Sequence, residues 1–267
     1  MRPARATILM YHRVGDRAVG RPEDDVYRVT TAGFAAQMAL LVREGYPIVP
    51  ASALDSAEVP PRAVVLTFDD GWDSDVDEAL PVLLRHGLTA SFFVSPALVG
   101  QEGYLSWDGV ARLHAEGMEV GSHGLDHTLL GEVPAQEASL QLRESRARLQ
   151  ERLGREIESV ALPGGNGGRR VARLAHAAGY RRVMGSQPGL AAGGSLLLPR
   201  FAIRRGDDLA TFRTVIDRSL SIRVRHGARH LVLTSARRLL GPAFYEAVKG
   251  RLLDGAGRGP SRAPDRG

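Results

Sequence analysis

The chain has 267 residues, of which 43% are hydrophobic and 24% charged, with a formal net charge of +5. These values are typical of a globular protein with one large α/β domain or two small ones. Because the chain has no cysteine, disulfides and cysteine-ligated metal sites are excluded. No stretch approaches the roughly 20 apolar residues of a membrane-spanning helix.

The N-terminal stretch MRPARATILMYHRV is basic and then briefly apolar. Its apolar part is shorter than the roughly 7–15 residues of a signal peptide, so we expect a cytoplasmic protein. The basic excess after residue 200 is compatible with peripheral contact with a membrane surface. It comes without a nucleic-acid-binding motif or interleaved aromatic residues, so we expect no nucleic-acid partner.

Strand-like and helix-like segments alternate along the chain. The β-rich or apolar segments that predict strands are 6–12, 63–68, 89–95, 118–123, 157–163 and 180–186. Amphipathic or capped segments predict helices over 31–45, 75–87, 106–117, 133–154, 169–179 and 208–220, with a last helical region from about 235 to 254.

This alternation predicts parallel strands covered by helices, and we expect an α/β fold of the distorted or incomplete (β/α) barrel type. The expected catalytic domain covers residues 1–205. A helical extension over 206–254 is expected to pack on it, followed by a disordered basic tail over 255–267. In such barrels, chemistry gathers at the C-terminal ends of the strands.

Two adjacent carboxylates stand at one of these strand ends, in LTFDDGWDS. Asp69 and Asp70 follow a buried strand, where like charges repel and lose hydration. A bound cation would offset that cost. A second polar cluster follows another predicted strand in SHGLDH, where His123 and His127 have the spacing of metal-ligating histidines.

Two imidazoles and one carboxylate form a typical three-ligand set for zinc, with one position left for water. If Asp70 supplies the carboxylate, Asp69 is left to accept a proton from that water. For the histidines alone, a core role for His123 and a surface role for His127 is the competing interpretation. A serine hydrolase using Ser122 is disfavoured, because Ser122 and His123 point to opposite faces of a strand.

TFDDG followed by SHGLDH resembles the polysaccharide deacetylase (NodB-homology) family, carbohydrate esterase family 4. The resemblance covers about residues 6–205. It implies a distorted β/α barrel and a divalent metal, most often zinc, used to remove acetyl groups from sugars. It also implies Asp69 as the catalytic base and Asp70, His123 and His127 as metal ligands.

The chain departs from the family pattern in several places. Gly124 replaces the Ser or Thr that usually follows the first histidine, and the third motif is ALPGGNGG in place of Arg and Pro-Tyr-Gly. A backbone N–H near Gly164 or Gly165 is the expected oxyanion donor, and a glycine-rich turn without catalytic value is the alternative.

The family's later motifs are absent, so the general acid needs another candidate. MYHRV resembles the branch with an N-terminal YH motif, which makes His12 the expected acid; a packed strand-end histidine is the alternative. Arg200 in LPRF is the candidate that orients the base.

We therefore expect a metal-dependent hydrolase that removes N-acetyl groups from a carbohydrate. Removal of O-acetyl groups is the less favoured interpretation. Its expected partner is an acetylated glycan or a lipid- or nucleotide-linked sugar, for example in exopolysaccharide biosynthesis. Two alternatives stay open. One is a carbohydrate-binding pseudoenzyme, suggested by the eroded motifs, and the other is an amidohydrolase acting on a small molecule that is not a sugar.

Overall fold

The computed structural model describes residues 5–17, 24–56 and 59–217. Its main sheet has the strand order β10-β1-β4-β5-β6-β7-β8, and all of these neighbours are parallel. The strands are β1 (Arg5–Tyr11), β4 (Val64–Phe68), β5 (Ser91–Val94), β6 (Glu119–Ser122), β7 (Ser159–Ala161), β8 (Arg182–Met184) and β10 (Phe201–Ala202). The short β9 (Ala191–Ala192) pairs antiparallel with β1. A separate parallel pair consists of β2 (Arg13–Val14) and β3 (Arg28–Val29).

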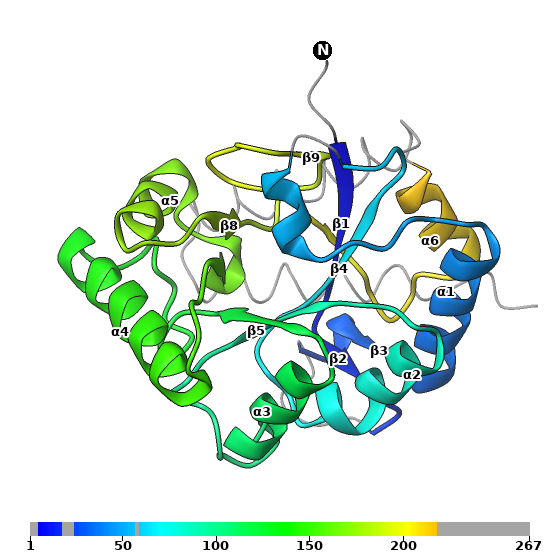
Figure 1. Ribbon diagram of the computed structural model, residues 1–267, viewed down its shortest axis with the longest axis horizontal. Coiled ribbons are helices and arrows are strands. Elements are labelled where there is room, and N and C mark those ends of the chain that lie inside the picture. The colour runs from blue at the N-terminus through cyan, green and yellow to red at the C-terminus, as the bar shows by residue number, and fades with distance from the viewer. Residues whose placement is uncertain (1–4, 18–23, 57–58, 218–267) are drawn as a thin grey trace, which may run out of the picture.

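The helices surround the curled sheet (Figure 1). They are α1 (Thr31–Arg43), α2 (Leu80–Arg85), α3 (Trp107–Ala115), α4 (Ala135–Leu153), α5 (Gly168–Ala177) and α6 (Leu209–Ile216). Short helical turns are η1 (Asp24–Tyr27), η2 (Ala51–Asp55), the π-helix η3 (Asp75–Ala79) and η4 (Pro163–Gly165). No helix of the described ranges is long and apolar enough to cross a membrane.

The sheet forms an incomplete barrel, which confirms the predicted fold class. The edge strands β8 and β10 do not pair with each other. The short segment 198–201 connects the two edges. Leu198 forms a bridge with Met184 at the end of β8, and Phe201 pairs with Leu9 of β1. Arg200 lies between these two pairings and therefore at the seam of the barrel.

The strands are buried on both faces, as expected for parallel strands covered by helices. In β4 every residue is buried, with alternate side chains in different clusters. Val64, Leu66 and Phe68 pack in the cluster that includes the helices. Val65 packs in the smaller inner cluster with Ile8. Because this alternation has a period of two, Asp69 follows Val65 and Thr67 on the inner face.

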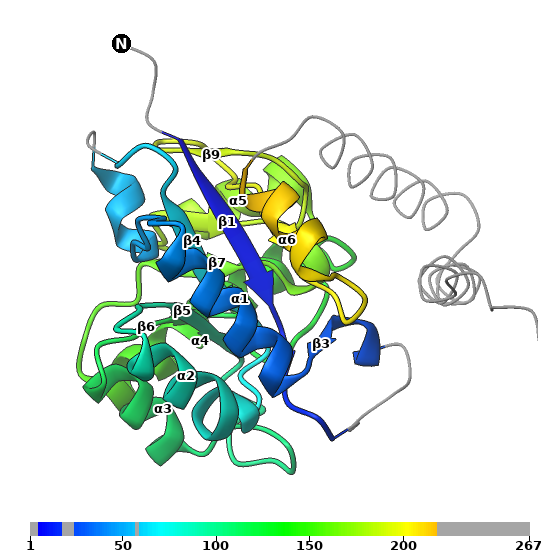
Figure 2. The same cartoon turned by 90° about the vertical axis from the view of Figure 1, so that its right-hand side faces the viewer.

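The expected C-terminal extension over 206–254 is described only as far as residue 217, through α6. Arg213 of α6 forms a 2.8 Å ion pair with Glu44, next to α1. Figure 2 shows α6 beside α1 on the outside of β1. The remainder of that extension and the expected tail over 255–267 lie outside the described residues.

Candidate metal centre and active site

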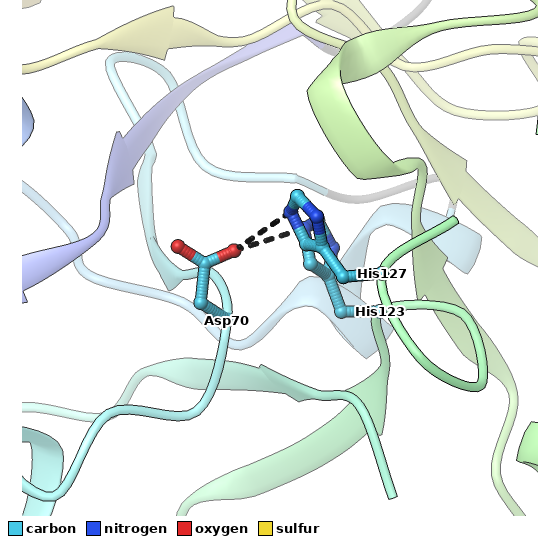
Figure 3. Close-up of side chains that lie close together, drawn as sticks. All are labelled: Asp70, His123 and His127. Carbon is cyan, nitrogen blue, oxygen red and sulfur yellow. Dashed lines mark ion pairs between the residues drawn. The ribbon is translucent and has the colours of Figure 1, made fainter. Parts of the chain in front are cut away.

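Three of the predicted site residues meet at the carboxyl ends of the strands. Asp70 follows β4, and His123 and His127 follow β6. The Oδ1 atom of Asp70 lies 3.2 Å from Nε2 of His123 and 3.3 Å from Nε2 of His127 (Figure 3). His123 is buried, whereas 42% of the His127 side chain is exposed, so the cluster is open to solvent on the His127 side.

The backbone at this cluster is unusual. Asp70 has a φ of 78° and His127 a φ of 67°, both in the left-handed region. Such a conformation costs a residue other than glycine about 1–3 kcal/mol and persists where the surrounding structure enforces it. Among the described residues, only Arg62 shares this property outside glycine. Local strain is therefore concentrated at two of the three clustered side chains.

The geometry fits a divalent metal ion. Ligand atoms about 2.0–2.2 Å from a tetrahedral zinc ion lie about 3.3 Å apart, close to the spacing of Asp70 Oδ1 from each imidazole. The three ligand atoms all lie within 4.8 Å of one another. The Nδ1 atom of His123 lies 3.0 Å from the carbonyl oxygen of Ala161. Since a carbonyl only accepts, Nδ1 carries the proton and Nε2 offers its lone pair to the cluster.

The electrostatics of Asp70 agree with this geometry. Burial raises the pKa of Asp70. When the imidazoles carry a proton on Nε2, hydrogen bonds from His123 and His127, together with the charges of His12 and His123, outweigh burial and hold the pKa well below its usual range. The carboxyl group is therefore ionised at neutral pH, which is the form that binds a cation.

Asp69 does not join the cluster of ligands but pairs with Arg200. Two guanidinium N–H groups donate to the two carboxylate oxygens, each at 2.7 Å, and both residues are buried. Arg200 also donates to Gly185 O and Thr67 Oγ1. Burial raises the pKa of Asp69. The charge of Arg200, followed by that of His123 and the hydrogen bonds from Arg200, outweighs burial and lowers the pKa below its ordinary value.

His12 follows β1 and faces the same end of the barrel. Its ring stacks on Tyr27 with a centroid distance of 4.7 Å. Its pKa is lowered, chiefly by burial, although the charges of Asp70 and Asp69 act in the opposite direction. The buried Nδ1 atom has no hydrogen-bond partner among the described residues. His12 is thus a largely neutral imidazole within electrostatic range of both aspartates.

The two candidate oxyanion donors differ. The N–H of Gly165 donates to Leu162 O at 2.7 Å, so that donor is already engaged. Gly165 also has a structural role, because a Cβ atom there would lie 1.8 Å from Ser186 Oγ. Gly164, with a φ of 59°, is left as the expected donor in this turn.

The loop that carries His127 is held from α4, which the sequence did not indicate. Gln141 accepts from Leu125 N at 3.1 Å and donates to Asp126 Oδ2 at 3.0 Å. The N–H of Gly124 donates to Ser122 Oγ, which lies 2.8 Å from Ser145 Oγ of the same helix. These bonds anchor the loop although Gly124 lacks a hydroxyl group.

Sequence reasoning also missed the residues around Asp70. A pocket beside Asp70 is lined by His12, Arg13, Tyr27 and Trp72, among others. The indole N–H of Trp72 donates to Asp70 Oδ2 at 3.1 Å. Trp72 lies only two residues from Asp70 in the motif, so its proximity was a usable signal. Tyr27 ends the short turn η1, for which the sequence carries no comparable signal.

Residues 56–183 match the family model described as polysaccharide deacetylase. The protein YxkH of Bacillus subtilis, whose name places it in the same family, is 25% identical over 195 residues, which cover 71% of this chain and 67% of YxkH. A chitin deacetylase of Pestalotiopsis is 31% identical over 45% of this chain and 40% of its own length. The peptidoglycan-N-acetylglucosamine deacetylase PgdA of Listeria monocytogenes is 36% identical over 46% of this chain and 25% of its own length.

Solved structures share the fold. The deacetylase PplD of Streptococcus pyogenes superimposes with a TM-score of 0.72 and 23% identity, over 80% of this chain and 99% of PplD. IcaB of Ammonifex degensii gives a TM-score of 0.68 with 24% identity, over 80% of this chain and 96% of IcaB. The match over residues 56–183 therefore relates this part of the chain to the polysaccharide deacetylase family.

Proposed function

We propose that the protein is a metal-dependent hydrolase that removes N-acetyl groups from a carbohydrate. The observation that carries this proposal is the convergence of Asp70, His123 and His127 on one point, with Asp69 next to Asp70 in the chain and held separately by Arg200. A divalent cation in this donor set, for which zinc is the proposed identity, supplies Lewis acidity to water and to the acetyl carbonyl.

The proposed base is Asp69. Its two hydrogen bonds from Arg200 fix the plane of the carboxylate and favour its ionised form. An ionised, oriented carboxylate accepts the proton of the attacking water as the new C–O bond forms. Arg200 acts through Asp69 and is proposed as a positioning residue.

The proposed acid is His12. Cleavage of the acetamide C–N bond leaves an amine that requires a proton, and the protonated, imidazolium form of His12 can supply it. The Gly164 N–H is the proposed donor to the negative charge that develops on the acetyl oxygen. His12 and Gly164 follow different strands, β1 and β7.

The names of two relatives support the substrate class. Chitin deacetylase and the peptidoglycan-N-acetylglucosamine deacetylase are both named for N-acetylated glycans. We extend this class, a glycan with N-acetylated amino sugars, to the present chain as a proposal. An amide substrate is proposed ahead of an O-acetyl ester.

The test is acetate release from a panel of N-acetylated oligosaccharides by the wild type and by Asp69→Asn. Loss of the base should lower kcat by about 10²–10⁴-fold. Zinc binding should persist, because the three proposed ligands are unchanged. Near-wild-type acetate release by Asp69→Asn would remove Asp69 from its role. A wild type that binds zinc but releases no acetate from any acetylated sugar would favour a binding protein.

A further inference from the structure

The two oxygens of the Asp70 carboxylate have different partners. Oδ1 faces the Nε2 atoms of His123 and His127 at 3.2 and 3.3 Å. Oδ2 accepts a hydrogen bond from the indole N–H of Trp72 at 3.1 Å. The side chain is thus divided between a site that suits a cation and a neutral donor on the opposite side.

Trp72 is itself held in place. Its ring stacks on Tyr104 with a centroid distance of 4.8 Å and an interplanar angle of 14°. The guanidinium carbon of Arg13 lies 5.1 Å from the centroid of the Trp72 ring. The indole therefore has a defined orientation that does not depend on Asp70.

The backbone supports the same arrangement. Trp72 and Tyr104 form an antiparallel bridge. The N–H of Leu105 donates to Gly71 O at 2.9 Å, and the N–H of Asp73 donates to Gly103 O at 3.0 Å. The segment on either side of Trp72 is therefore tied to the turn that precedes α3.

An indole N–H donates and cannot accept, and it is neutral at every relevant pH. By occupying Oδ2, it leaves Oδ1 as the oxygen directed at the imidazoles and opposes rotation of the carboxylate. Groups that orient a metal ligand in this way commonly contribute 10–100-fold to metal affinity.

We propose that Trp72 is a positioning residue that holds Asp70 as a one-oxygen ligand of the metal centre and thereby sets the metal affinity. The inference rests on the proposed metal centre. It assigns to Trp72 a role in addition to lining the pocket beside Asp70.

The first experiment compares Trp72→Phe with Trp107→Phe in the full chain. Phenylalanine keeps an aromatic ring for Tyr104 but has no N–H. Trp107 is the other tryptophan of the chain, and at the start of α3 its ring stacks under Arg152. Zinc and cobalt affinities are measured by competition with a chelator, and the cobalt-loaded proteins are compared by visible absorption.

Trp72→Phe should bind zinc about 10–100-fold more weakly and show an altered cobalt spectrum, whereas Trp107→Phe should match the wild type. Equal affinities and identical spectra for Trp72→Phe and wild type would overturn the inference. If the wild type itself bound no zinc, the proposed metal centre would fail, which is a different result.

A second measurement needs no substitution at Trp72. The chain has two indole N–H groups, which ¹⁵N-labelled tryptophan makes visible by NMR. Stoichiometric zinc should shift one of the two signals, and the signal that persists in Trp107→Phe identifies it as Trp72. A Trp72 signal unmoved by zinc that does bind would also overturn the inference.

Discussion

Arg200 and Asp69 form two parallel hydrogen bonds of 2.7 Å, although 131 residues separate them in the chain. Arg200 is wholly buried and lies at the seam where the barrel almost closes. A buried charge without a partner is strongly destabilising, so the pair couples closure of the fold to the ionisation state of the proposed base.

Replacing Arg200 should therefore affect stability and pH dependence together. Arg200→Met leaves the Asp69 carboxylate buried without its partner, which should cost about 3–5 kcal/mol of unfolding free energy. Because burial alone raises the pKa of Asp69, the acid limb of kcat/KM should move to higher pH. Urea unfolding and pH–rate profiles check both effects. Arg200→Lys, which keeps the charge without the bidentate geometry, should be intermediate. An acid limb unchanged in Arg200→Met would contradict the pairing's role.

Replacing His12 tests the general acid. His12→Gln should lower kcat by about 10²–10⁴-fold. Burial lowers the pKa of His12, so its protonated form is lost as pH rises through a value below about 6.5. The wild-type kcat should therefore fall as the pH rises through that value. The residual kcat of His12→Gln should not show this fall. His86→Gln, at the end of α2 outside the barrel, is the control and should behave as wild type. Full activity of His12→Gln would leave His12 as a packed strand-end residue.

Asp75 should make the protein less stable as pH rises. It is fully buried, and neither carboxylate oxygen has a hydrogen-bond partner among the described residues. Burial, followed by the charges of Asp70, Asp73 and Asp69, raises its pKa well above the ordinary value. The folded state thus holds this proton more tightly than the unfolded state, so its contribution is complete below about pH 3.9 and declines as pH rises toward the folded-state pKa.

Asp75→Asn replaces the titrating carboxyl group with an amide that does not titrate. Relative to the wild type, the metal-free variant should gain stability with rising pH above about pH 4, by about 1.4 kcal/mol for each unit of the pKa shift. Chemical unfolding at several pH values between 4 and 8 measures the difference. Parallel pH profiles for the two proteins would show that Asp75 does not titrate as described.

Gln141 should influence metal binding without touching the metal. It holds Leu125 N and Asp126 within the loop that leads to His127. Gln141→Ala should therefore weaken zinc affinity by about 10–100-fold, and saturating zinc should restore much of the activity. Gln136→Ala, an exposed position on the same helix, should leave the affinity unchanged. Equal affinities for the two variants would exclude this role.

The parts predicted from the sequence are those with strong local signals. One apolar run is followed by Asp69 and Asp70, and a second run leads to His123. Both runs indicated parallel strands, whose carboxyl ends lie at the same rim of a barrel. The alternation of strands and helices was sufficient for the incomplete barrel, and the predicted helix 75–87 begins with the π-helical turn η3. The motif spacing was sufficient to select the clustered side chains.

The contacts that support the site lacked such signals. Gln141 sits in a long polar helix that reads as a solvated surface, and only packing of α4 on the 124–128 loop gives it partners. Arg200 was chosen as a candidate, but its partner depends on how the last strands meet β1. The hydrogen bond from the Gly165 N–H to Leu162 O forms in a tight turn. The glycines permit the backbone angles of this turn but do not specify them.

The central claim is that one divalent cation is held by Asp70, His123 and His127. Anomalous diffraction at the zinc edge, from crystals grown with zinc, tests it most directly. The account predicts one strong peak about 2.0–2.2 Å from Asp70 Oδ1 and from Nε2 of both histidines. A fully zinc-loaded protein with no peak at that point, or with its peak on other side chains, would contradict the claim.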